Sequence, residues 1–273
     1  ENDPRKIWKK FSENYYLFRG TPTAMWLDYS FEKVFGITEL LTPATSDFYY
    51  NHIEEKLSQP EFLPRALFDK FNIEVLSTTD SAVSNLSYHA ELKRSTWGGN
   101  VIPTYRPDSV VNPEMSEFKN NLSKLAELTS EDTYSWDGYL KAHKSRRLFF
   151  KEMGATASDH GHPTARTENL SYTHAEQLFN RILAEEFSAE DADKFRGQML
   201  TEMAKMSCED GLVMQIHPGS RRNHSNKILN QFGLDKGFDI PGCTDYVSAL
   251  KPLLDEVGLR TDLTIILFTL DET

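Results

Sequence analysis

Five short apolar runs rich in β-branched residues recur in the chain after residue 70, and each ends in polar or charged residues. The runs are IEVLSTTD at 73–80, VIPTYRPD at 101–108, ATASDHGHP at 155–163, LVMQIHPGS at 212–220 and LTIILFTLDET at 263–273. Segments with helical periodicity separate the later runs, at 115–129, 135–154, 173–187, 188–207 and 244–258. Strands that alternate with helices in this way predict a parallel sheet covered by helices.

A parallel sheet can stay open or close into a barrel, and two observations favour the barrel. Neither GxGxxG nor GxxxxGK[ST], the glycine-rich turns typical of open nucleotide-binding sheets, occurs in the sequence. Polar side chains instead follow several different strands, as they do where the carboxyl ends of barrel strands form a site. We therefore expect an α/β fold of the barrel type.

The first 70 residues follow a different pattern, which predicts several helices. Trp8, Phe11, Tyr15 and Phe18 recur at helical spacing, and the proline-containing strings TPT at 21–23 and TPA at 42–44 interrupt the pattern. We expect a helical region at 1–70, followed by the sheet-containing region at 71–273.

Charge and cysteine content narrow the range of partners. Lys and Arg number 30 against 41 Asp and Glu, which gives a formal charge of -11, and no basic run is long enough to follow a phosphate backbone. We expect no nucleic-acid partner. Cys208 and Cys243 lie in no metal-binding or redox spacing, which favours a reduced, cytoplasmic setting. No stretch of about 18 apolar residues occurs, so we expect no membrane insertion.

Arg106 ends the second apolar run and precedes Pro107, which stops the strand and keeps the guanidinium near its end. A guanidinium in this place can hold a substrate carboxylate through two parallel hydrogen bonds. A structural ion pair with Asp108 is the alternative.

Asp159, His160 and His162 follow the third run, and Gly161 permits an unusual backbone between the two histidines. Two imidazoles separated by one residue on an extended strand point to the same side, which is a workable spacing for metal ligands. Histidines in such turns also serve as hydrogen-bonding partners that stabilise the loop. Asp159 could orient a substrate hydroxyl or a neighbouring histidine.

The fourth run, LVMQIHPGSRRNH, holds the densest group of functional side chains. Gln215 and His217 share a strand face, so a barrel interior would receive both. His217 could bind a divalent metal through a ring nitrogen, while Arg222 binds an anion. The alternative is a core histidine followed by an exposed basic turn.

Several long strings resemble the uronate isomerases of the amidohydrolase superfamily, and the resemblance runs from about residue 5 to residue 273. The strings are FRGTPTAMWLDYSFEKVFGI, IEVLSTTDSA, IPTYRPDSVV, WDGYL, FFKEMGATASDHGHPTART, MLTEM, GLVMQIHPGSRRNH and ALKPLLDE.

The resemblance implies a (β/α)8 TIM-type barrel with an added helical region, of which this chain would hold about strands 2 to 6. It implies an intramolecular oxidoreductase, an aldose-ketose isomerase that interconverts D-glucuronate with D-fructuronate and D-galacturonate with D-tagaturonate. A divalent metal, zinc in most such enzymes, would be held by an HxH pair on the first strand, a middle-strand His and a last-strand Asp.

The same resemblance assigns roles to five residues of this chain. His217 corresponds to the middle-strand metal ligand, Arg106 and Arg222 to substrate-binding arginines, and Asp159 to a catalytic aspartate. A catalytic tyrosine corresponds to Tyr16, with Tyr15 as the alternative. The metal-binding HxH pair and last-strand Asp have no counterpart here, which lowers the expectation that His160 and His162 bind metal.

These departures predict a chain that is incomplete for catalysis, with a uronate as its small-molecule ligand. A noncatalytic fragment and a metal-dependent hydrolase of the same superfamily remain alternatives. An open sheet with exposed edges also favours association into a homo-oligomer. We expect Arg106, Asp159, His217 and Arg222 to converge around one cavity at the carboxyl ends of the strands.

Overall fold

The computed structural model describes residues 1–270, and the chain divides into two compact units, the first ending at Glu74 and the second starting at Val75. The first unit is helical. Its α-helices are α1 (Pro4–Asn14), α2 (Pro22–Tyr29), α3 (Ser46–Leu57) and α4 (Pro64–Lys70), with 3-10 turns at Tyr15–Phe18 and Pro60–Phe62 and a π-helical turn at Ser30–Val34.

Proline and a capping side chain begin the first two helices of this unit. The Asp3 carboxylate accepts hydrogen bonds from the backbone N–H groups after Pro4, and the Thr21 hydroxyl does the same for the N–H of Ala24. Apolar and aromatic residues of this unit then form a small core. Its buried members are Tyr15, Ala24, Phe31, Ile37, Leu41 and Tyr49, with Trp8, Phe11 and Phe18 packed against them. The helical pattern predicted for this region is confirmed.

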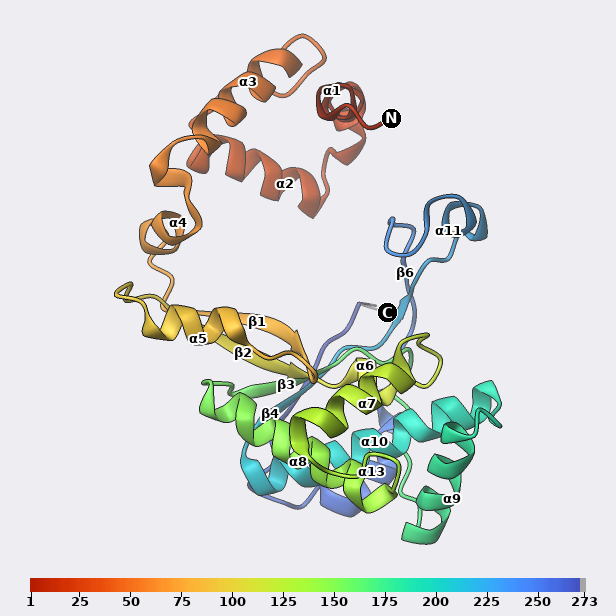
Figure 1. Cartoon of the computed structure of the whole chain (residues 1–273). Helices are drawn as coiled ribbons and strands as arrows, with labels where there is room; N and C mark the ends of the chain where they lie inside the picture. Colours follow the sequence, from red (N-terminus) through yellow and green to blue (C-terminus); the bar gives the residue numbers. More distant parts are fainter. Residues whose placement is uncertain (271–273) are drawn as a thin grey trace. The chain divides into compact units, whose positions relative to one another are not determined.

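The second unit is built on a parallel sheet of five strands in the order β1-β2-β3-β4-β7. The strands are β1 (Val75–Ser81), β2 (Asn100–Arg106), β3 (Ala157–His160), β4 (Val213–Ile216) and β7 (Ile265–Leu267). Figure 1 shows β1 to β4 side by side, with helices gathered against the sheet. The chain therefore has the parallel α/β architecture of a partial barrel.

Helices connect these strands and bury one face of the sheet. They are α5 (Ser87–Arg94), α6 (Asp108–Val111), α7 (Phe118–Thr129), α8 (Trp136–Glu152), α9 (Tyr172–Leu183), α10 (Ala189–Asp210), α11 (Asn226–Phe232), α12 (Tyr246–Ala249) and α13 (Lys251–Val257). Met214 and Ile216 of β4 belong to the apolar core formed with these helices, whereas Gln215 between them is partly exposed. This alternation leaves the other face of β4 for polar side chains.

Serine side chains cap the N-termini of α8 and α10. The Ser135 hydroxyl accepts a hydrogen bond from the N–H of Gly138, and Ser188 forms a reciprocal capping box with Asp191. None of the helices within residues 1–270 combines the length and the apolarity needed to span a bilayer.

Several strands are shorter than the apolar runs predicted. The third run, 155–163, forms a strand only at Ala157–His160, and the fourth, 212–220, only at Val213–Ile216. His217 therefore lies one residue beyond β4. The last run forms Ile265–Leu267, and its final residues, 271–273, lie outside the described part. Runs of apolar residues extend into the loops because these loops also pack on the core.

The connection from β4 to β7 contains a small antiparallel hairpin that was not predicted. Its strands are β5 (Ser220–Arg221) and β6 (Ile240–Pro241), and the N–H of Gly242 donates to the carbonyl of Gly219 at its base, 2.7 Å away. Two-residue strands carry too little periodicity to be recognised from sequence.

Candidate functional site

Three of the predicted site residues meet at the carboxyl ends of neighbouring strands. Asp159 of β3 lies between the other two, with Oδ1 2.8 Å from Nε2 of His217 and Oδ2 3.6 Å from a terminal guanidinium nitrogen of Arg106. The parallel register aligns these ends, since Tyr105 pairs with Ser158 and the N–H of His217 donates to the carbonyl of His160. The result is a polar site at the carboxyl ends of β2, β3 and β4.

Pro107 and Asp108 place Arg106 at this edge. Pro107 ends β2 because it has no N–H to continue the ladder, and α6 starts at Asp108. Asp108 then accepts a hydrogen bond from Nε of Arg106 at 2.8 Å. The ion pair considered as the structural alternative therefore exists. It involves Nε, so it leaves the terminal nitrogens of Arg106 on the side of Asp159.

The guanidinium of Arg106 stays charged at this partly buried position. Burial disfavours the charged form, but the hydrogen bond that Arg106 donates to Asp108 and the charges of Asp108 and Asp159 outweigh burial and raise the pKa of Arg106. A permanently charged, partly exposed guanidinium is suited to binding a carboxylate.

His160 and His162 are buried on the other side of this edge. Their rings lie 6.0 Å apart, and Nε2 of His160 lies 3.1 Å from the Ser158 hydroxyl. Burial lowers the pKa of His162 to about 4 and the pKa of His160 further below its ordinary value. Both imidazoles are therefore neutral at pH 7.

A metal site that is complete within the described residues is absent. No group of three or more His, Cys, Asp or Glu side chains in residues 1–270 is arranged to hold a metal ion. His217, the predicted ligand, turns its Nε2 toward Asp159. Since zinc takes four ligands, these residues alone do not fit the metal that the resemblance implies.

Arg222 makes its contacts outside the group formed by Arg106, Asp159 and His217. It follows β5 in the hairpin, is half exposed, and pairs at 3.8 Å with Asp239, the residue before β6. No hydrogen bond or ion pair within residues 1–270 joins it to Arg106, Asp159 or His217. The expected meeting of all four side chains is thus seen for three of them.

Tyr16 lies in the first unit, on the 3-10 turn that follows α1. Its side chain is 66% exposed, whereas its neighbour Tyr15 is buried and donates a hydrogen bond to Asp28 at 2.8 Å. Tyr16 also lines a cavity of about 340 Å³ together with Arg19. The structure therefore leaves the hydroxyl of Tyr16 accessible, and its catalytic role stays a prediction.

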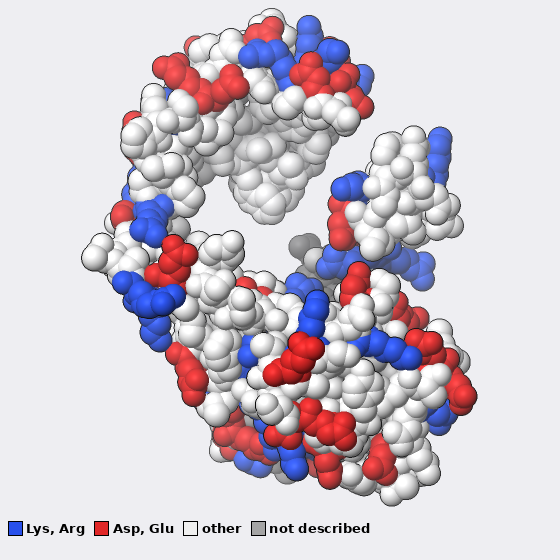
Figure 2. Space-filling model, viewed as in Figure 1, with Lys and Arg blue, Asp and Glu red and all other residues white. Residues whose placement is uncertain are grey.

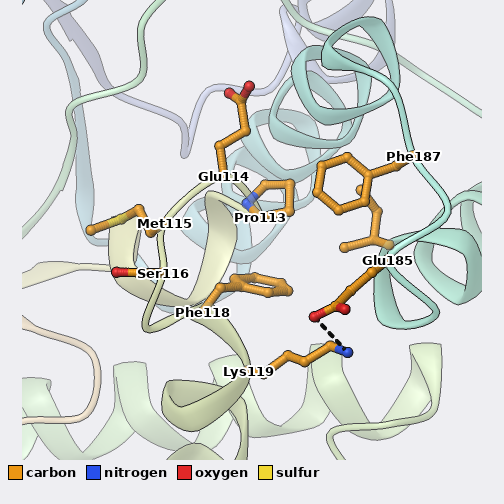
Figure 3. Close-up of a pocket in the computed structure, with 9 residues that line it drawn as sticks. Pro113, Glu114, Met115, Ser116, Phe118, Lys119, Glu185 and Phe187 are labelled. Carbon is orange, nitrogen blue, oxygen red and sulfur yellow. Dashed lines mark ion pairs between the residues drawn. The ribbon is translucent and has the colours of Figure 1, made fainter.

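A separate cavity of about 370 Å³ lies beside the start of α7 (Figure 3). Its wall includes Phe118, Phe187 and an ion pair between Lys119 and Glu185 at 2.9 Å. None of the predicted site residues lines it.

Over the helices of the second unit, on the face drawn in Figure 2, acidic and basic side chains are interspersed.

Two residues near the site were not predicted to take part in it. Phe268 packs edge-on against His217, with ring centroids 6.4 Å apart, and no local pattern near residue 268 indicates this contact. Asp108 also contacts the turn after β3, as described below. Asp108 lies two residues after Arg106 in the sequence, and this spacing predicted only an ion pair between the two side chains.

The parallel sheet, with an arginine, a carboxylate and a histidine at the carboxyl ends of its strands, is that of an α/β barrel-type protein. The chain matches the sequence pattern of the glucuronate isomerase family over residues 1–273, and it belongs to this family.

Individual relatives agree with this assignment. The chain is 58% identical over 273 residues to a uronate isomerase of Rhizobium meliloti, an alignment that covers 100% of this chain and 58% of the relative. Its fold is similar to the crystal structure of glucuronate isomerase from Caulobacter crescentus, with a TM-score of 0.95 and 52% identity over 100% of this chain and 57% of that one. For uronate isomerase from Thermotoga maritima the TM-score is 0.90 and the identity 27%, over 99% and 60% of the two chains. The chain thus spans less than two thirds of the length of these relatives.

Proposed function

We propose that this chain forms the substrate-binding edge of a uronate isomerase, which interconverts D-glucuronate with D-fructuronate and D-galacturonate with D-tagaturonate. The observation that carries the proposal is the contact series from Arg106 through Asp159 to His217 at the carboxyl ends of β2, β3 and β4. Membership of the glucuronate isomerase family and the names of the relatives support the reaction.

The reaction moves a carbonyl group between adjacent carbons without net oxidation. The proton on C2 of the aldose passes to C1 through an enediol, and the proton of the C2 hydroxyl passes to the oxygen on C1. In our proposal Arg106 binds the distal carboxylate of the uronate and so fixes the orientation of the reacting carbons. Asp159, whose Oδ1 lies 2.8 Å from Nε2 of His217, accepts or returns a hydroxyl proton.

We also propose a substrate-binding role for Arg222 and a catalytic role for Tyr16. Arg222 is half exposed and its pairing with Asp239 is long, so its guanidinium is available to a second anionic or hydroxyl group. The hydroxyl of Tyr16 is accessible in the first unit, and it would act as a catalytic proton donor.

We propose a divalent metal, zinc, with His217 as one ligand. Because no three-ligand group exists in residues 1–270, the other ligands would come from the part of the family's length that this chain does not cover. A homo-oligomer and a cytoplasmic location are further proposals; both cysteines are free thiols, as in a reducing compartment.

The test is an isomerisation assay on two samples. One is the 273-residue chain, and the other is the same chain completed with the remaining segments of the Rhizobium meliloti relative. We expect the completed protein to form ketose from D-glucuronate and D-galacturonate, and the chain alone to form none. Asp159→Asn in the completed protein should lower kcat by about 100-fold or more. A completed protein that forms no ketose would refute the proposal.

A noncatalytic role is the second candidate, because the residues described here do not hold a complete ligand set. In that case neither sample would isomerise a uronate or bind one. Hydrolysis of a lactone or ester by the completed protein, without ketose formation, would instead identify a hydrolase.

A further inference from the structure

Asp108 contacts two segments that are far apart in the sequence. One of its oxygens accepts a hydrogen bond from Nε of Arg106 at 2.8 Å, and both oxygens lie within 3.2 Å of the backbone nitrogen of Gly161. The nearer ring nitrogen of His162 is 3.9 Å away. The carboxylate thus connects the end of β2 with the turn that follows β3.

Gly161 gives this turn its close approach to the site. A Cβ atom at this position would lie 2.3 Å from Nη2 of Arg106, 2.8 Å from Oδ2 of Asp108 and 2.9 Å from Cε1 of His217. All three atoms are ends of side chains. An added methyl group would therefore move functional groups rather than the backbone of the sheet.

We propose that Asp108 and Gly161 are positioning residues, which hold the guanidinium of Arg106 beside Asp159 and in reach of the substrate carboxylate. The substrate part of this inference rests on the proposed uronate isomerase function. Asp108 fixes Nε and thereby orients the plane of the guanidinium, while Gly161 leaves the space that the guanidinium and the imidazole of His217 occupy. Neither residue touches substrate in this proposal.

A purely structural ion pair is the competing explanation, and it makes a different prediction. A structural pair would contribute to stability and leave the geometry of Arg106 unchanged when the pair is weakened. A positioning pair instead affects how firmly Nε–H is held and how well a uronate binds. Arg260 and Asp262 offer a matched control, because they form the same two-residue pairing between Nε and a carboxylate at 3.0 Å, outside the site.

The first experiment measures the Nε–H group of Arg106 directly. The chain is labelled with 15N-arginine, the Nε–H signals are recorded at pH 7, and Arg106→Lys assigns the signal of interest. We expect the Arg106 signal to exchange with solvent at least about tenfold faster in Asp108→Asn, because a charge-assisted hydrogen bond has been weakened. Asp262→Asn should leave the Arg106 signal unchanged. Equal exchange in wild type and Asp108→Asn would overturn the inference.

The second experiment compares kinetic constants in the completed protein. Asp108→Asn should raise KM for D-glucuronate roughly tenfold and change kcat much less, since the loss concerns binding of a remote carboxylate. Gly161→Ala should raise KM with little change in the thermal unfolding midpoint. Asp108→Glu, which keeps a carboxylate, should lower KM relative to Asp108→Asn but not to the wild-type value. A fall in thermal stability without any change in KM would show an ordinary structural pair.

The two measurements separate the inference from the function on which it rests. If the completed protein does not isomerise any uronate, the proposed function fails, and the solvent exchange of the Arg106 Nε–H alone decides whether Asp108 holds the guanidinium. If isomerisation is present and the signal of Arg106 does not respond to Asp108→Asn, the positioning role is refuted while the function stands.

Discussion

Replacing Asp210 by Asn should destabilise the second unit more than replacing its partner, Arg147, by Met. Arg147 of α8 is fully buried, whereas the side chain of Asp210 at the end of α10 is 21% exposed. The guanidinium donates from Nε to Oδ2 of Asp210 at 2.5 Å and from a terminal nitrogen to Oδ1 at 2.9 Å. Its other partners are the Ser207 hydroxyl and the sulfur of Met203.

The unequal burial determines which change costs more. Asp210→Asn leaves a charged guanidinium in the core with only neutral partners, a situation that costs about 3–5 kcal/mol of unfolding free energy. Arg147→Met removes the buried charge and fills similar space with an apolar side chain. The remaining carboxylate of Asp210 reaches water and still accepts a hydrogen bond from the N–H of Leu212. We expect a cost of about 1–2 kcal/mol for this variant.

The assay is urea unfolding of the chain, followed by hydrogen exchange of peptides from α8 and α10, which reports on the second unit alone. The exposed pair of Arg260 and Asp262 supplies the control, since Arg260→Met and Asp262→Asn should leave the unfolding midpoint unchanged. Equal losses in the two core variants, or a larger loss in Arg147→Met, would refute the argument from burial.

Three further predictions concern pH, capping and substrate binding. Burial and the nearby charge of Arg147 lower the pKa of His143 from 6.5 to about 3. The contribution of neutral His143 to the free energy of unfolding is therefore complete above pH 6.5, and it falls by about 1.4 kcal/mol per pH unit as the pH drops toward 3. Urea unfolding at several pH values should show a shallower decline for His143→Gln, and an unchanged decline would contradict the assignment. Ser188→Ala removes the capping box of α10 and should cost about 1 kcal/mol in the same assay; no loss would mean that the cap is unimportant here. Arg106→Lys in the completed protein should raise KM for D-glucuronate at least about tenfold, because an ammonium group cannot form the two parallel hydrogen bonds; an unchanged KM would exclude Arg106 from carboxylate binding.

The parallel sheet could be predicted because its strands are short, apolar and separated by helices with clear periodicity. Pro107 marked the end of β2, and Ser188 marked the start of α10, as the structure confirms. The helix α5 was not predicted, since its sequence SYHAELKR has only three apolar positions, one of them alanine and another the exposed Tyr88. The β5–β6 hairpin was missed because its strands are two residues long.

The candidate site was predictable only in part. Arg106, Asp159 and His217 were identified by their places at the ends of apolar runs, and parallel strands bring such ends together. The place of Arg222 depends on a hairpin whose geometry is set by tertiary contacts such as its pairing with Asp239. The closeness of Gly161 to two side chains is likewise a property of the folded turn, because a glycine in a sequence does not reveal what fills the space beside it.

The β5–β6 hairpin is an insertion between β4 and β7 that could be exchanged without changing the sheet. Met214 of β4 pairs directly with Ile265 of β7. The pairing of these two strands therefore does not depend on the hairpin that lies between them in the sequence. Libraries randomised over residues 223–240 would therefore vary the surroundings of Arg222 on an unchanged sheet. In the proposed isomerase, such a layout would allow preference among related sugar acids to evolve separately from the chemistry at Asp159.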